Sequence, residues 1–149
     1  DIREGGNNLK YVVLVSHGDF ATGLKTSLDM LAGKRDDVIA VGLPDGKTAD
    51  EFALMFKQAV QAVTEEDEII LLADIVGGSP LTTSLNVLAD EGKLANTITI
   101  GGMNLPLALT SVLMKDSLDK ETFTATVVSE AKAALQEFKL EQPEEDDEI

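Results

Sequence analysis

Four short apolar runs alternate with segments whose apolar residues recur at helical spacing, and this alternation is the strongest constraint on the fold. The runs cover residues 11–16 (YVVLVS), 38–42 (VIAVG), 68–73 (EIILLA) and 97–101 (TITIG). Short, continuous apolar runs are typical of strands that are covered on both faces. Strands that alternate with helices form parallel sheets. We therefore predict an α/β fold, a three-layer sandwich whose central, mostly parallel sheet is covered by helices on both faces.

The segments between the runs carry local helix signals, namely capping residues at their starts and glycines after their ends. The first helix is indicated by apolar residues from Phe20 to Leu31 and the second by a capping box formed by Thr48 and Glu51. The predicted helices run from about residue 20 to just before Gly33, from Thr48 to about Val63, from Ser79 to Asp90, from the cap Asn104 to Lys115, and from Asp119 to Phe138.

His17 is the only histidine, and it follows the first strand directly, just as Asp74 follows the third. We predict the strand order 2-1-3-4, in which the second strand flanks the first on one side and the third on the other. In open α/β sheets, ligands bind beyond the carboxyl ends of the strands where the order reverses. That point lies between the first and third strands, so His17 and Asp74 are expected to face each other across it.

The stretch from Gly77 to Pro80 (GGSP) is expected to start a helix at the same edge. Pro80 is preset for a first helical turn, and Ser79 is predicted to be the N-cap. Gly77 and Gly78 allow bare backbone to approach a ligand closely. The free N–H groups and the positive dipole end of a helix start attract anions. This edge of the sheet is therefore predicted to bind an anionic group.

A histidine, a carboxylate and an anion-binding helix start together suit a phosphoryl group carried on an imidazole. One ring nitrogen attacks phosphorus, while Asp74 accepts a hydrogen bond from the other nitrogen and holds its tautomer. Ser79 and the backbone hold the phosphoryl oxygens. Each residue also has a structural interpretation: His17 as a packing residue, Asp74 as a loop cap and GGSP as an ordinary helix start. Their coincidence at one edge favours the functional interpretation.

Composition excludes several other classes of function. The chain has no cysteine, which rules out disulfides, thiolate metal sites and cysteine catalysis. With one histidine, a metal site is poorly supported. No nucleotide-binding P-loop is present, and no cofactor is expected. The net charge of −15, from 12 basic and 27 acidic residues, argues against nucleic-acid binding and favours partners with a basic face.

The chain is expected to hold one domain, at residues 9–141, with no interdomain linker. Residues 1–8 are interpreted as a leftover or disordered lead, and residues 142–149 as an acidic, disordered tail. No apolar run reaches the roughly 18 residues of a membrane span, and no signal peptide is evident. We expect no direct membrane insertion and a cytoplasmic location.

Three motifs, V-S-H-G, L-A-D-I-V-G-G-S-P and G-G-M-N-L-P, together resemble one protein family over residues 9–138. The family is the enzyme IIA component of the mannose family (mannose/fructose/sorbose type) of the bacterial phosphoenolpyruvate-dependent sugar phosphotransferase system (PTS). The resemblance implies a cytoplasmic phosphoryl carrier with a phosphohistidine intermediate. Such a carrier accepts phosphoryl from the phosphocarrier protein HPr and passes it to a IIB component, which couples it to carbohydrate uptake through the membrane components IIC and IID.

The same resemblance assigns roles to individual residues. By position in the motifs, His17 matches the phosphoryl acceptor and donor, Asp74 the residue that orients the imidazole, and Ser79 the residue beside the phosphoryl group. The family's loop glycines and the residues of its third loop near the site are matched by Gly18, Gly77, Gly78, Asn104 and Pro106.

The resemblance also implies a homodimer in which a C-terminal antiparallel strand is added to the edge of the partner's sheet. Residues 136–141 (QEFKLE) are the candidate, with Phe138 and Leu140 on one face; the alternative is simply the end of the last helix. A free-standing IIA is expected, with IIB, IIC and IID as separate chains.

Two other functions stay open at this point. One is the phosphocarrier subunit of dihydroxyacetone kinase, against which GGSP argues. The other is a non-catalytic regulatory or interaction domain of the same fold, against which the intact His17, Asp74 and Ser79 argue. The carbohydrate is open among mannose, fructose, sorbose, N-acetylgalactosamine and gluconate.

Overall fold

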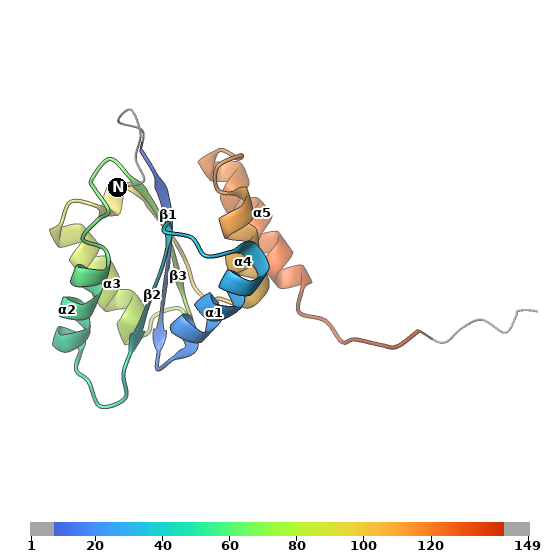
Figure 1. Ribbon diagram of the computed structural model, residues 1–149, viewed down its shortest axis with the longest axis horizontal. Helices are drawn as coiled ribbons and strands as arrows, with labels where there is room; N and C mark the ends of the chain where they lie inside the picture. The colour runs from blue at the N-terminus through green and yellow to red at the C-terminus, as the bar shows by residue number, and fades with distance from the viewer. Residues whose placement is uncertain (1–7, 142–149) are drawn as a thin grey trace, which may run out of the picture.

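The computed structural model describes residues 8–141, which form one sheet of four parallel strands between two layers of helices (Figure 1). The strand order is β2-β1-β3-β4, which confirms the predicted order. The elements in chain order are β1 (Lys10–His17), α1 (Phe20–Ala32), β2 (Val38–Leu43), α2 (Ala49–Ala59), β3 (Glu68–Ala73), α3 (Ser79–Asp90), a 3₁₀ turn η1 (Leu94–Asn96), β4 (Thr97–Ile100), α4 (Leu105–Met114) and α5 (Lys120–Ala133).

The alternation of side chains along the central strands divides the core in two. Val12 and Leu14 of β1 point to the face that α1, α4 and α5 cover, while Val13 and Val15 point to the face that α2 and α3 cover. All four side chains are fully buried. Because β1 and β3 have neighbours on every side, their residues are almost all apolar, as the sequence indicates.

Two predicted helices end earlier than expected. The second stops at Ala59, not near Val63, because Val60 and Val63 are buried in a turn that leads the chain into β3. The last stops at Ala133, not at Phe138. Beyond α5 the side chains of Leu135, Phe138 and Leu140 are exposed, so a longer helix would bury nothing against the body. Helices in proteins are stabilised mainly by such packing.

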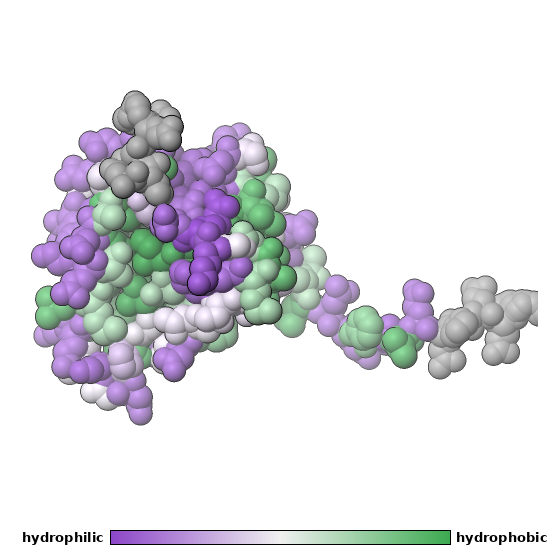
Figure 2. Space-filling view, in the orientation of Figure 1, coloured by the Kyte–Doolittle hydropathy of each residue, from purple (hydrophilic) through white to green (hydrophobic). Residues whose placement is uncertain are grey.

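Residues 135–141 leave the body as an extended, non-helical segment (Figure 2). They form no strand within the single chain, so the exchanged antiparallel strand stays a prediction that concerns a second copy. The interpretations of residues 1–7 and 142–149 fall outside the described residues.

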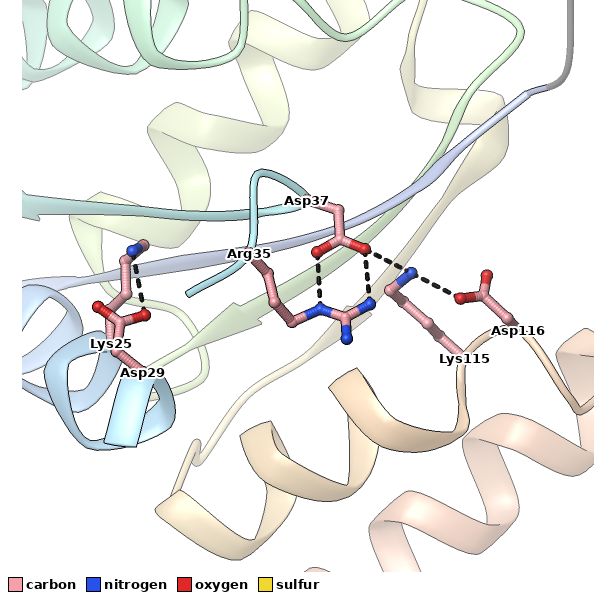
Figure 3. A network of polar contacts seen from close by, with 6 residues as sticks. All are labelled: Lys25, Asp29, Arg35, Asp37, Lys115 and Asp116. Atoms are coloured by element: carbon pink, nitrogen blue, oxygen red, sulfur yellow. Dashed lines mark hydrogen bonds and ion pairs between the residues drawn. The ribbon is translucent and has the colours of Figure 1, made fainter. Parts of the chain in front are cut away.

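Ion pairs close the amino-terminal edge of the sheet (Figure 3). Asp37, just before β2, binds the Arg35 guanidinium through both oxygens at 2.9 Å. The ammonium group of Lys115, which follows α4, lies 2.9 Å from Asp37 and 3.0 Å from Asp116. The Lys115 side chain is only 3% exposed. This network joins the end of α4 to the start of β2, at the end of the sheet opposite to His17.

Candidate active site at the carboxyl edge of the sheet

His17 and Asp74 meet at the carboxyl ends of β1 and β3, as predicted. The two strands pair in parallel up to Val15 and Ala73, and β1 continues to His17, so His17 and Asp74 both lie at the carboxyl edge of the sheet. The Nδ1 atom of His17 lies 2.7 Å from Oδ2 of Asp74. The same Oδ2 accepts a 2.8 Å hydrogen bond from the backbone N–H of His17. One carboxylate oxygen therefore holds both the ring and the backbone of the histidine.

The carboxylate of Asp74 determines which ring nitrogen of His17 carries the proton. Its oxygens only accept hydrogen bonds, so Nδ1 is the donor and Nε2 of the neutral ring keeps a lone pair. Burial opposes ionisation of Asp74, but hydrogen bonds from the backbone and ring of His17 and from the backbone of Ile75 outweigh it, and the pKa of Asp74 is lowered. Within residues 8–141, Nε2 has no hydrogen-bond partner, and the imidazole side chain is 48% exposed.

The start of α3 lies against the imidazole ring, and here one prediction is wrong. The N-cap is Gly78, with no side-chain cap, and the exposed Ser79 is the first helical residue. A Cβ on Gly78 would lie 2.8 Å from Cε1 of His17, so the ring packs directly on glycine backbone. Gly77 has a φ of 87°, which turns the chain into the helix. The first-turn N–H groups thus begin beside the ring and are not covered by a capping side chain.

Gly18 turns the chain from β1 toward α1 with a φ of 55°. Its N–H donates a 2.7 Å hydrogen bond to the carbonyl of Leu43 at the end of β2. Ser16, which was not singled out from the sequence, is fully buried, and its hydroxyl accepts a 2.7 Å hydrogen bond from the N–H of Ala21. The available signal was a lone serine at the end of an apolar strand, directly before the histidine.

The loop from β4 to α4 packs beside the site, but neither its last residue, Asn104, nor Pro106 at the start of α4 hydrogen-bonds to His17 or Asp74. Asn104 caps α4 by accepting a 2.8 Å hydrogen bond from the N–H of Leu107, and Pro106 lies in the first turn. The loop is tied to the end of β3 by a 2.9 Å hydrogen bond from the N–H of Met103 to the carbonyl of Ala73. We assign these two residues to loop geometry.

The described part of the chain contains no cluster of three His, Cys, Asp or Glu side chains placed to hold a metal ion. Among the helices of residues 8–141, none has the length and apolar content that crossing a membrane requires.

Comparison with known proteins identifies the family. The family model described as PTS system fructose IIA component (EIIA-man) matches residues 11–128. A PTS system fructose-specific EIIA component of Bacillus subtilis is 30% identical over 107 residues, which are 72% of this chain and 71% of the relative.

Solved structures share the fold. The PTS IIA protein associated with the fucose utilization operon of Streptococcus pneumoniae superimposes with a TM-score of 0.74 at 28% identity, covering 88% of this chain and 94% of that one. The mannose/sorbose specific IIA subunit of Enterococcus faecalis gives a TM-score of 0.75 at 17% identity, covering 91% and 98%. Fold, motifs and sequence agree, and the chain belongs to the fructose and mannose type of PTS enzyme IIA components.

Proposed function

We propose that this chain carries a phosphoryl group on Nε2 of His17, accepting it from phospho-HPr and passing it to a IIB component. The observation that carries the proposal is the 2.7 Å contact between His17 Nδ1 and Asp74 Oδ2. It leaves Nε2 as the free nucleophile on a half-exposed ring. The neighbouring start of α3 offers donors for the phosphoryl oxygens.

The transfer is a displacement between two imidazole rings. The lone pair of Nε2 attacks phosphorus, the P–N bond to the HPr histidine breaks, and that nitrogen keeps the bonding pair. The Nδ1 proton of His17 stays in its hydrogen bond to Asp74, whose negative charge stabilises the charge that develops on the ring. Ser79 and the first-turn N–H groups of α3 hold the oxygens. Transfer to IIB repeats the displacement in the opposite direction.

The net charge of −15 supports a brief encounter with basic-faced carriers. Since the chain handles only the phosphoryl group, its role is the same whichever carbohydrate the membrane components IIC and IID take up. This role assigns the chain to the cytoplasm.

The experiment incubates the protein with phosphoenolpyruvate, enzyme I and HPr, and follows an acid-labile phosphoryl adduct by mass spectrometry. We expect an adduct on wild type and none on His17→Ala. Asp74→Asn is expected to slow uptake about 100-fold while keeping the fold, because an amide does not impose the Nδ1–H tautomer. Wild-type rates in Asp74→Asn would show that Asp74 does not orient the ring.

Two other outcomes would contradict the proposal. No adduct on wild type, or an unchanged adduct on His17→Ala, would favour a non-catalytic interaction domain. Onward transfer to a dihydroxyacetone kinase subunit, and not to a IIB protein, would replace the proposed acceptor.

The proposed carrier is a homodimer in which residues 136–141 add a strand to the partner's sheet. Two features support it: Phe138 and Leu140 are exposed in the single chain, and β4 is an outer strand of the described sheet. Sedimentation at increasing protein concentration should show a dimer for wild type and a monomer for Phe138→Asp. A monomeric wild type would refute the dimer and leave the phosphoryl test unaffected.

A further inference from the structure

The hydroxyl of Ser16, the residue before His17, has no part in the proposed chemistry. It accepts a 2.7 Å hydrogen bond from the N–H of Ala21 in the first turn of α1. It also donates a 3.3 Å hydrogen bond to the carbonyl of Gly18. One fully buried side chain thus joins the residue after His17 to the helix that follows.

Ser16 does for α1 what an N-cap side chain ordinarily does. The N-cap residue of α1 is Asp19, and its side chain makes no cap hydrogen bond. First-turn N–H groups have no partner inside a helix and need an acceptor from elsewhere. For Ala21 that acceptor comes from the last buried residue of β1. The start of α1 is therefore fixed relative to β1 through this hydroxyl.

The other side of the turn rests on β2. The N–H of Gly18 donates to the carbonyl of Leu43 at 2.7 Å. A Cβ on Gly42 would overlap the carbonyl oxygen of Gly18, so only a glycine at position 42 allows this approach. The Gly18 carbonyl thus contacts both the hydroxyl of Ser16 and the bare backbone of β2 at Gly42.

This turn sets the position of the nucleophile. The backbone N–H of His17 and its ring share one oxygen of Asp74, at 2.8 and 2.7 Å. The Cε1 atom of the ring, next to Nδ1, packs on Gly78. A shift of the turn moves the backbone of His17 and breaks this shared geometry. Displacement of a reacting group by about 1 Å can slow a reaction about 100-fold.

We infer that Ser16 is a positioning residue for the phosphoryl-carrying histidine, acting through the Gly18 turn and the first turn of α1. This inference rests on the proposed function, because it assigns Ser16 a part in the reaction of His17. It makes no claim that Ser16 touches the phosphoryl group.

The test compares Ser16→Ala with Ser111→Ala. Ser111, on α4, is equally buried, and its hydroxyl has no hydrogen-bond partner among the residues that the structure describes. At saturating phospho-HPr we expect Ser16→Ala to take up phosphoryl about 10 to 100 times more slowly. The concentration of phospho-HPr that gives half-maximal rate should not change. Ser111→Ala should match wild type, and Ser16→Thr, which keeps a hydroxyl, should recover most of the rate.

A second readout does not depend on transfer. The ¹⁵N spectrum of the His17 ring should show one dominant Nδ1–H tautomer in wild type and in Ser111→Ala, and a mixture in Ser16→Ala. Wild-type rates together with a wild-type ring spectrum in Ser16→Ala would overturn the inference. If wild type takes up no phosphoryl group, the proposed function fails, and the ring spectrum still decides whether Ser16 orders the histidine.

Gly42→Ala tests the role of the Gly18 turn in a second way, which serves if Ser16→Ala does not fold. Its added methyl group presses on the Gly18 carbonyl oxygen and removes no hydroxyl. We expect slowed uptake with the same mixed ring spectrum. Gly23→Ala is the matched control, because a Cβ there meets no atom of residues 8–141 within 4 Å apart from the nearby backbone of its own helix. Wild-type uptake in Gly42→Ala would show that the turn does not position His17.

Discussion

At each end of the sheet, an aspartate pairs with a nitrogen-containing side chain. One of these side chains is buried, and the other is half-exposed. At the amino-terminal end, Lys115 is 3% exposed and bonded to Asp37, which Arg35 also holds (Figure 3). At the carboxyl end, His17 is 48% exposed and keeps one ring nitrogen free. The buried pair of Asp37 and Lys115 connects the start of β2 to the end of α4. In the pair of His17 and Asp74, only Nδ1 of the ring is bonded, and Nε2 has no partner within residues 8–141.

The helix starts show the same difference. Helices α2, α4 and α5 are capped by the side chains of Thr48, Asn104 and Asp119. In contrast, α1 and α3, which flank His17, begin at Asp19 and Gly78 without a side-chain cap. Of the α-helices in residues 8–141, the two without a side-chain cap from their own N-cap residue are therefore the ones that adjoin His17. Beside it, the start of α1 receives an acceptor from Ser16 of β1, and the start of α3 has no side-chain cap.

Breaking the ion pair between Lys115 and Asp37 should have the largest effect on stability. We expect Lys115→Met to lower the free energy of unfolding by about 3 kcal/mol, because it leaves Asp37 at a largely buried position with only Arg35 as its partner. Urea unfolding measures this loss. Phosphoryl uptake per folded molecule should stay at the wild-type value, since Lys115 lies at the opposite end of the sheet.

The matched control is Asp116→Asn, which removes the other carboxylate bound to Lys115. The Asp116 side chain is 67% exposed. An exposed pair of this kind contributes at most about 1 kcal/mol, so this variant should unfold near wild type. Equal losses in the two variants would mean that burial does not distinguish the two contacts.

Lowering the pH should reduce the stabilisation that Asp37 and Asp74 contribute at the two ends of the sheet. Burial opposes ionisation of Asp37, but hydrogen bonds from Arg35 and Lys115 outweigh it and lower its pKa from the ordinary 3.8. The pKa of Asp74 is also lowered. A lowered pKa means that the unfolded chain binds more protons in acid, so the stabilisation is complete above the ordinary value and is lost as pH falls through the folded one.

The difference in unfolding free energy between wild type and Asp37→Asn should therefore be constant near pH 7 and narrow from about pH 5 downward. The difference in unfolding free energy between wild type and Asp74→Asn should decrease over the same pH range. Urea titrations at several pH values measure both. A difference that does not depend on pH in either variant would show that the carboxylate charge does not stabilise that end.

Much of the fold was predictable because β1 and β3 are buried on both faces, which makes their sequences continuously apolar. Helix ends were less predictable. The chain turns after Ala59 because Val60 and Val63 pack into the core, and α5 stops where its side chains no longer meet the body. Such contacts depend on the tertiary structure and not on the residues nearby in the chain.

The site divides in the same way. His17 and Asp74 were predictable because each lies at the carboxyl end of a buried strand. Ser79 was expected to be the N-cap since serine is the better capping residue, but His17 packs where a side chain at Gly78 would lie. The part of Ser16 was missed because its partner Ala21 is brought close only by the turn at Gly18.

The smallest expected effect is the difference in stability lost on mutating the N-cap residue of a capped helix, α2, and of an uncapped one, α1. At α2, the hydroxyl of Thr48 accepts from the N–H of Glu51 at 3.1 Å, and the Glu51 carboxylate accepts from the N–H of Thr48 at 2.8 Å. Thr48→Ala should therefore cost about 1 kcal/mol of unfolding free energy. Asp19→Ala should change it by less than about 0.5 kcal/mol, because Asp19 makes no cap bond. Urea unfolding of both variants decides the point. If Asp19→Ala cost as much as Thr48→Ala, Asp19 would be the cap of α1 in solution, and Ser16 would lose the structural role on which its effect on His17 depends.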